Sequence, residues 1–235
     1  MAAQSGCVAV AIEPQLLCMR HIAATARENG GLPIRAYQNI LGIKNFSARV
    51  RIDQCTGTRQ FLENGQVGDA FDNGGTDVED ACLMQDVPAA RLDDLVGASE
   101  RVALWHVDTE GAEKLVLESA PRLFAEHRID RVILEWEPER LKTFELSLEE
   151  VNAFMVGLFR GWSCRRLCSA EPVNWRAQLP MPILPHMDVY CTRPGLHDPP
   201  HSDQTSKRMA EACKAVAKKV AEATAESRRP WWRLW

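Results

Sequence analysis

The chain has 235 residues, of which 46% are hydrophobic, and its formal net charge is -4. This length and apolar content allow one sizeable α/β core, whereas a second full domain would be cramped. The negative charge argues against nucleic acid as the main partner.

The amino-terminal segment and the eight cysteines bear on location. Residues 1–15 lack a basic leader and a long apolar run, and no later segment predicts a membrane span. The cysteines show neither the CxxC pairs of a zinc site nor the density of a secreted disulfide scaffold. We therefore expect a cytoplasmic protein whose thiols are mostly reduced.

Strand and helix patterns alternate in the first part of the chain. Residues 8–12 form a short strand pattern that Glu13 closes. A helix over 16–26 follows and is stopped by Asn29, and residues 34–40 predict the next strand.

The central part holds the most regular pattern. Residues 48–52 alternate only in part, and turn-forming residues within 63–86 predict no regular structure there. After a helical turn over 92–96, the apolar run 102–107 is typical of a central parallel strand. A helical stripe then extends over 110–123.

The next elements repeat the arrangement of a strand followed by acid. Residues 131–136 predict a strand, and Ser147 with Glu150 predicts a capping box at the start of a helix. Residues 163–168 and 187–192 predict an antiparallel pair that closes the sheet.

The composition changes after residue 193, so one domain is expected over 1–193. Residues 194–206 predict a linker, and 207–225 predict an alanine- and lysine-rich helix. The tryptophan- and arginine-rich tail that ends the segment 207–235 suits a membrane surface or a partner. A tail that packs on its own domain or stays disordered is the favoured interpretation.

Acidic residues stand at the ends of three predicted strands. Glu13 follows the first, Asp108 and Glu110 follow the second, and Glu135 lies near the end of the third. Ligand sites of open α/β sheets lie outside the carboxyl ends of the strands. A carboxylate there can accept the hydroxyls of a ribose or take a proton from a substrate hydroxyl.

Each candidate also has a simpler interpretation. Glu13 can be a solvated loop acid, and an acid at a helix N-terminus contributes roughly 0.3 to 1 kcal/mol without any catalytic role. We assign Glu113 to that structural role, Asp108 to function and Glu110 to either. His106 shares a face with Asp108 by strand alternation, so a general base and a buried core histidine both remain open. Carboxylates scattered over two strand ends predict no metal site.

Several of these segments together resemble the FkbM family of S-adenosylmethionine-dependent methyltransferases: VAIEPQ, RLDDLV, VDTEGAEKLVLESAPRL and RVILEWEPERL. The match runs from about Gly6 to Leu141, with a weaker tail to Thr192, and DTEGAE is its most specific part. It implies a class I methyltransferase fold, which is a mostly parallel Rossmann-like sheet with helices on both faces.

The resemblance also implies a function. S-adenosylmethionine would lie across the carboxyl edge of the sheet, and the substrate would be a hydroxyl of a small or sugar-like molecule. Glu13 and Glu110 are expected to bind the cofactor, and Asp108 and His106 to act at the methyl-transfer site. The family more often has a lysine at the position of His106.

The beginning of the chain departs from the family pattern. The first strand and its glycine-rich loop, where the backbone would approach the cofactor, are not found. Two interpretations stay open, of which we favour the first: a truncated gene model of an active enzyme, or a non-catalytic remnant that binds a partner. A sheet without its central strand would expose two unpaired edges, which predicts poor solubility.

Overall fold

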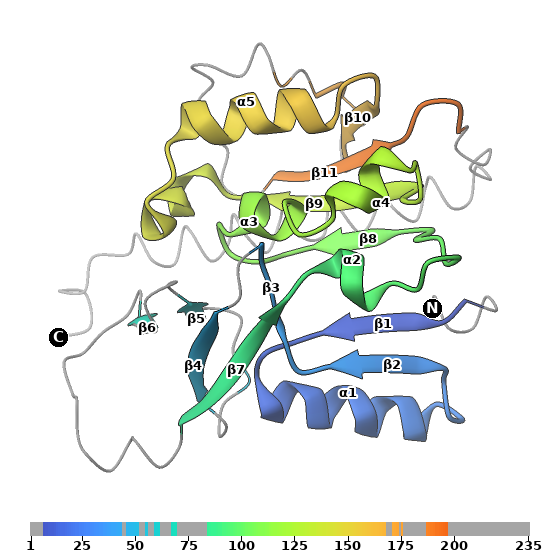
Figure 1. Ribbon diagram of the computed structural model, residues 1–235, viewed down its shortest axis with the longest axis vertical. Coiled ribbons are helices and arrows are strands. Elements are labelled where there is room, and N and C mark those ends of the chain that lie inside the picture. Colours follow the sequence, from blue (N-terminus) through green and yellow to red (C-terminus); the bar gives the residue numbers. More distant parts are fainter. Residues whose placement is uncertain are drawn as a thin grey trace, which may run out of the picture.

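A computed structural model describes residues 7–43, 46–51, 55, 59–61, 67–69, 84–167, 171–173, 175 and 187–196. The strands in this part of the chain form four sheets, which Figure 1 shows with the helices around them. Apart from its first residues, the predicted linker over 194–206 lies outside the described residues, as do the predicted helix over 207–225 and the aromatic tail.

The chain begins with a parallel β-α-β unit. Strand β1 (Ala9–Ile12) is followed by helix α1 (Leu16–Glu28), which ends at Asn29 as predicted, and strand β2 (Ile34–Tyr37) pairs with β1. The predicted strand over 34–40 is interrupted, because strand β3 (Ile40–Leu41) leaves β2 and joins another sheet.

That second sheet is built from segments that are distant in the sequence. Strand β7 (Met84–Ala90) pairs in parallel with β3 and antiparallel with β4 (Ser47–Arg51), and a separate hairpin joins β5 (Arg59–Phe61) to β6 (Val67–Asp69). The prediction of no regular structure over 63–86 is therefore wrong for β6 and for the start of β7. Pairing between β4 and β7 depends on long-range packing, which local patterns do not report.

The four-stranded main sheet follows the order β10-β11-β9-β8. Strands β8 (Trp105–Val107) and β9 (Arg131–Trp136) are parallel, and β11 (Met187–Thr192) is antiparallel to both β9 and β10 (Ser163–Arg166). This confirms the predicted closing pair and places β11 inside the sheet.

Short helices flank these strands. They are α2 (Leu92–Leu95), α3 (Glu113–Leu117), α4 (Pro121–Ala125), the 3₁₀ helix η3 (Pro138–Phe144) and α5 (Leu148–Leu158). The single helix predicted over 110–123 is thus two helices. Pro121 opens α4 and disfavours the helical conformation in Ala120, whose φ is -125°.

The capping prediction for α5 is half confirmed. The Ser147 hydroxyl accepts from the Glu150 amide at 3.1 Å, but the Glu150 carboxylate pairs with Lys114 at 3.2 Å. The reciprocal bond of a capping box is thus replaced by an ion pair between α3 and α5.

The main sheet has two different faces. Residues of β8, β9 and β11 that point to one face are buried with side chains of α3, α4 and α5, and they include Trp105, Val107, Leu134, Trp136 and Val189. The opposite face carries His106, Ile133 and Glu135, which are exposed or half-buried. The alternating burial along β9 explains why the sequence predicted this strand well.

The fold is therefore α/β, and its parallel strand pairs β1-β2, β3-β7 and β8-β9 lie in three different sheets. Strands β1, β2, β8 and β9 point the same way, so their carboxyl ends lie on one side of the molecule (Figure 1). Among the described strands, β1 pairs only with β2 and β8 only with β9, which leaves one edge of each open.

The cysteines differ from the expectation of mostly reduced thiols. Cys164 and Cys191 face each other across β10 and β11 and form a disulfide, and a second disulfide joins Cys18 to Cys55. Cys7 is free and exposed. Cross-strand register brings Cys164 beside Cys191, so the spacing of the cysteines in the sequence gives no signal of this pair.

Candidate active site

Two carboxylates meet at the carboxyl ends of the parallel strands β8 and β9. Val107 is aligned with Leu134, so the next residues, Asp108 and Glu135, stand side by side on the same face. A hydrogen bond joins the two side chains. It raises the pKa of Glu135 to about 8, and partial burial and the nearby charges of Asp108, Glu137 and Glu110 act in the same direction. Asp108 itself is exposed, so the pair is accessible from solvent.

An arginine balances the neighbouring acids. Arg140 in η3 pairs through Nη1 with Glu110 and through Nε with Glu137, the latter at 2.9 Å. Partial burial raises the pKa of Glu110, whereas Arg140 opposes that rise. Glu137 is only 2% exposed. The structure therefore brings Asp108, Glu110, Glu135 and Glu137 near one another, and Arg140 pairs with two of them, Glu110 and Glu137.

The turn between β8 and α3 carries two of these acids. Glu110 and Gly111 both have left-handed backbone conformations, with φ of 57° and 102°. A Cβ atom on Gly111 would lie 2.7 Å from Cβ of Arg140, so the close approach of η3 requires glycine here.

Glu113 lies in the first turn of α3, which confirms its predicted structural place at a helix N-terminus, and it also contacts the acidic turn. It is fully buried, and its Oε1 accepts from the Gly111 amide at 2.9 Å, from the Thr109 amide at 3.3 Å and from the Thr109 hydroxyl at 3.2 Å. Burial raises the pKa of this carboxyl. Glu113 is thus tied to the acidic turn, and its contribution is not limited to a helix dipole.

Glu13 lies apart from this group, on the two-stranded β1-β2 sheet. Its Oε1 accepts from the Gln15 amide at 2.7 Å, and partial burial raises the pKa of its carboxyl. This contact matches the simpler interpretation of a loop acid. The carboxyl end of β1 nevertheless lies on the same side of the molecule as those of β8 and β9 (Figure 1).

His106 is exposed in β8, so the hypothesis of a buried core histidine is wrong. Strand alternation places it on the same face as Asp108, one row further from the strand end. The imidazole is available to a bound substrate, and its role as a base stays a prediction.

Sequence reasoning missed Arg140 and Glu137 as members of the site. The signal was present, because Glu137 and Arg140 are three positions apart directly after a predicted strand. That spacing places two side chains on the same side of one helical turn. The described residues hold no group of three or more His, Cys, Asp or Glu side chains suited to a metal ion.

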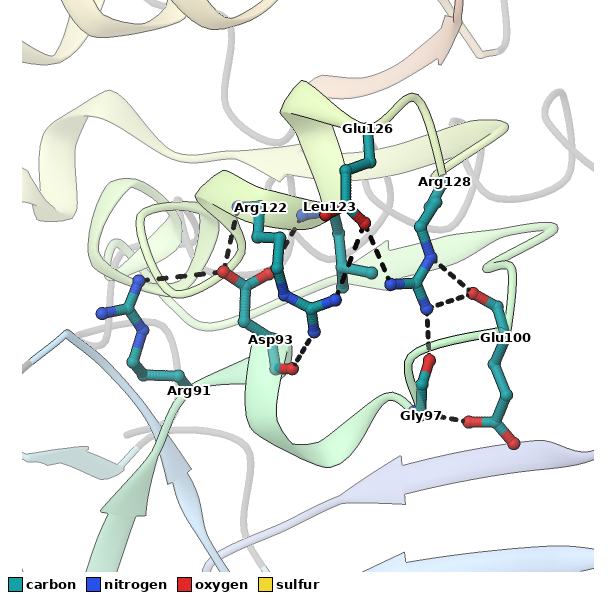
Figure 2. A network of polar contacts seen from close by, with 8 residues as sticks. All are labelled: Arg91, Asp93, Gly97, Glu100, Arg122, Leu123, Glu126 and Arg128. Carbon is teal, nitrogen blue, oxygen red and sulfur yellow. Dashed lines mark hydrogen bonds and ion pairs between the residues drawn. The ribbon is translucent and has the colours of Figure 1, made fainter.

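The RLDDLV segment serves a structural purpose. Figure 2 shows Asp93 of α2 reaching the start of α4, where its carboxylate accepts from the amides of Arg122 at 2.9 Å and Leu123 at 3.0 Å. Nearby, Arg128 bonds the carbonyls of Gly97 and Glu100. These contacts fasten the segment before β8 to the helix and loop before β9.

Comparisons with known proteins identify no relative: no family model, no curated protein and no solved structure matches the chain. In the part of the chain that the structure describes, no helix has the length and apolar character needed to cross a membrane.

Proposed function

We propose that the chain is an S-adenosylmethionine-dependent methyltransferase that acts on a hydroxyl group of a small-molecule or sugar-like substrate. The observation that carries the proposal is the Asp108–Glu135 pair, which stands at the carboxyl ends of two parallel strands. Ligands of open α/β sheets bind at such ends. The resemblance of the surrounding segments to the FkbM family supports the same proposal.

The ribose end of the cofactor fits the residues present. Glu13 is a half-buried carboxylate directly after a parallel strand, where an acid can accept ribose hydroxyls. Among the described residues, no glycine-rich loop follows a strand to bind the methionine part of the cofactor. Gly111 does stand between a strand and a helix, but Arg140 fills the space beside it. The proposal therefore depends on Glu13 and on the acids of β8 and β9.

These acids can move the proton that hydroxyl methylation releases. When bound, the cofactor supplies an electrophilic methyl group. Asp108 is exposed and can accept the proton of a substrate hydroxyl within hydrogen-bond reach. Below about pH 8, Glu135 keeps its own proton and donates it to Asp108. Above that pH Glu135 is ionised and no longer donates this hydrogen bond to Asp108.

Calorimetric titration of the purified chain with S-adenosylmethionine tests the proposal. Glu13→Ala should weaken binding roughly 10- to 100-fold, because hydrogen bonds to a charged group contribute about 1.5 to 3 kcal/mol. Glu28→Ala is the matched control, since it removes an exposed acid from the same β-α-β unit. If a chain with native near-UV circular dichroism shows no binding, the proposal fails.

A second candidate is a non-catalytic protein that binds a partner. It is favoured by the open edges of β1 and β8 together with exposed apolar side chains next to them: Val8 at 53%, Val10 at 37% and Leu104 at 50% exposure. Open strand edges can pair with another chain. A folded chain that does not bind S-adenosylmethionine would favour this candidate.

A further inference from the structure

The acidic turn between β8 and α3 has a conformation that its sequence does not favour. Glu110 is a non-glycine residue with φ of 57°, and it is followed by Gly111 at 102°. Left-handed conformations are uncommon for residues with a side chain and persist where surrounding contacts impose them. Something outside residues 109–111 must therefore hold the turn.

Glu113 supplies that contact from inside the molecule. One oxygen of its buried carboxylate accepts all three bonds described above, two from Thr109 and one from Gly111. The donors lie on the turn, upstream of α3. A carboxylate that only complemented the helix dipole would not need the Thr109 hydroxyl, which is a side chain of the turn itself.

Arg140 holds the same turn from outside. Its backbone carbonyl carbon and oxygen would each lie 3.0 Å from a Cβ atom on Gly111, and its guanidinium pairs with Glu110. The turn is thus enclosed between α3 and η3, and the direction of Asp108 at its start depends on both contacts.

We propose that Glu113 is a positioning residue, whose buried carboxylate fixes the Thr109–Gly111 turn and so directs Asp108 toward Glu135 and Glu110 toward Arg140. The catalytic meaning of this role rests on the proposed methyltransferase function. The geometric role itself does not, because it concerns contacts within the chain.

The titration of Glu135 reports this geometry directly. Its pKa of about 8 depends first on the hydrogen bond with Asp108. The other charged groups around it are Glu110 from the turn, Glu137 from the end of β9 and Asp188, which is aligned with it on β11. If the turn relaxes and Asp108 moves away, the Glu135 midpoint must fall toward the ordinary glutamate value.

Carbon-13 NMR titration of the side-chain carboxyls in the full chain is the test. Glu113→Ala should lower the Glu135 midpoint by about one unit or more, while Glu113→Gln should keep it, because the amide oxygen can still accept from Gly111 and Thr109. The matched control is Glu118→Gln, which removes a carboxylate that pairs with Lys114 and does not touch the turn.

Thr109→Val covers the case in which Glu113→Ala does not fold. It removes one of the three donors and should lower the midpoint by a smaller amount, and Thr109→Ser should restore it. An unchanged Glu135 midpoint in a folded Glu113→Ala or Thr109→Val chain would overturn the inference. A shifted midpoint in a chain that does not bind S-adenosylmethionine would sustain it and refute only the proposed function.

Discussion

Asp93 is a buried polar side chain whose removal should destabilise the fold. It is 7% exposed, and its carboxylate accepts from the amides of Arg122 and Leu123 in the first turn of α4. The residue before α4, Ala120, offers no side-chain cap. Asp93 therefore caps this helix from a distant part of the chain.

The cost of Asp93→Ala follows from the groups left behind. Loss of a helix cap costs about 0.5 to 2 kcal/mol, and a buried amide without a partner costs about 1 to 3 kcal/mol. Because Leu123 is fully buried, its amide has no access to water. The two contributions overlap, so we expect a decrease of about 2 to 4 kcal/mol in the free energy of unfolding.

Urea unfolding followed by tryptophan fluorescence measures this decrease. Asp93→Asn keeps one acceptor oxygen and should lose about half as much. Asp94→Ala is the matched control on the same helix, since Asp94 is exposed and should change stability by less than about 0.5 kcal/mol. An Asp93→Ala chain as stable as Asp94→Ala would refute the capping role.

Three further predictions concern the site and its supports. Folding raises the pKa of Glu135 from 4.5 to about 8, so its stabilising contribution is full below pH 4.5 and is lost as the pH rises to about 8. Because the group is partly exposed, the free energy of unfolding of wild type should fall between pH 6 and pH 9 by only about 1 kcal/mol more than that of Glu135→Gln. Urea unfolding at the two pH values measures this difference, and parallel pH profiles would contradict it. Gly111→Ala should lower the free energy of unfolding by about 2 to 4 kcal/mol, because of backbone strain and the clash with Arg140. Gly157 in α5 has open space beside it, so Gly157→Ala should raise the free energy of unfolding by about 0.5 to 1 kcal/mol. Replacing Cys164 and Cys191 together by alanine should lower the free energy of unfolding by about 2 to 4 kcal/mol under oxidising conditions. If the disulfide causes this decrease, dithiothreitol should destabilise wild type and remove most of the difference between the two chains.

The parts of the fold that sequence predicted are those with a local physical signal. Strand β9 alternates buried and half-buried residues along its length, and the Ser147 cap of α5 is present. The parts that it missed depend on distant partners. Strand β7 is ordered by β3 and β4, and the disulfide between Cys164 and Cys191 depends on the register of β10 and β11.

The candidate site was predictable to the same extent. Asp108 and Glu135 follow from the rule that parallel strands end at one edge of a sheet, and the structure places them in hydrogen-bond contact. The contacts of Glu113 with Thr109 and Gly111 were not predictable, because they depend on the left-handed conformations of Glu110 and Gly111. A pattern of residue types does not contain those angles.

Stability and site geometry are carried by different contacts, so they can be changed separately. Asp93 caps α4 through the amides of Arg122 and Leu123, and these contacts do not involve the acidic turn. Its loss should lower the free energy of unfolding while the folded chain keeps the pKa of Glu135 near 8. Glu113 acts on the turn itself, so its loss should change the titration of Glu135 in chains that remain folded. If both substitutions moved both properties together, the site would be coupled to global packing, and the assignment of a specific positioning role to Glu113 would fail.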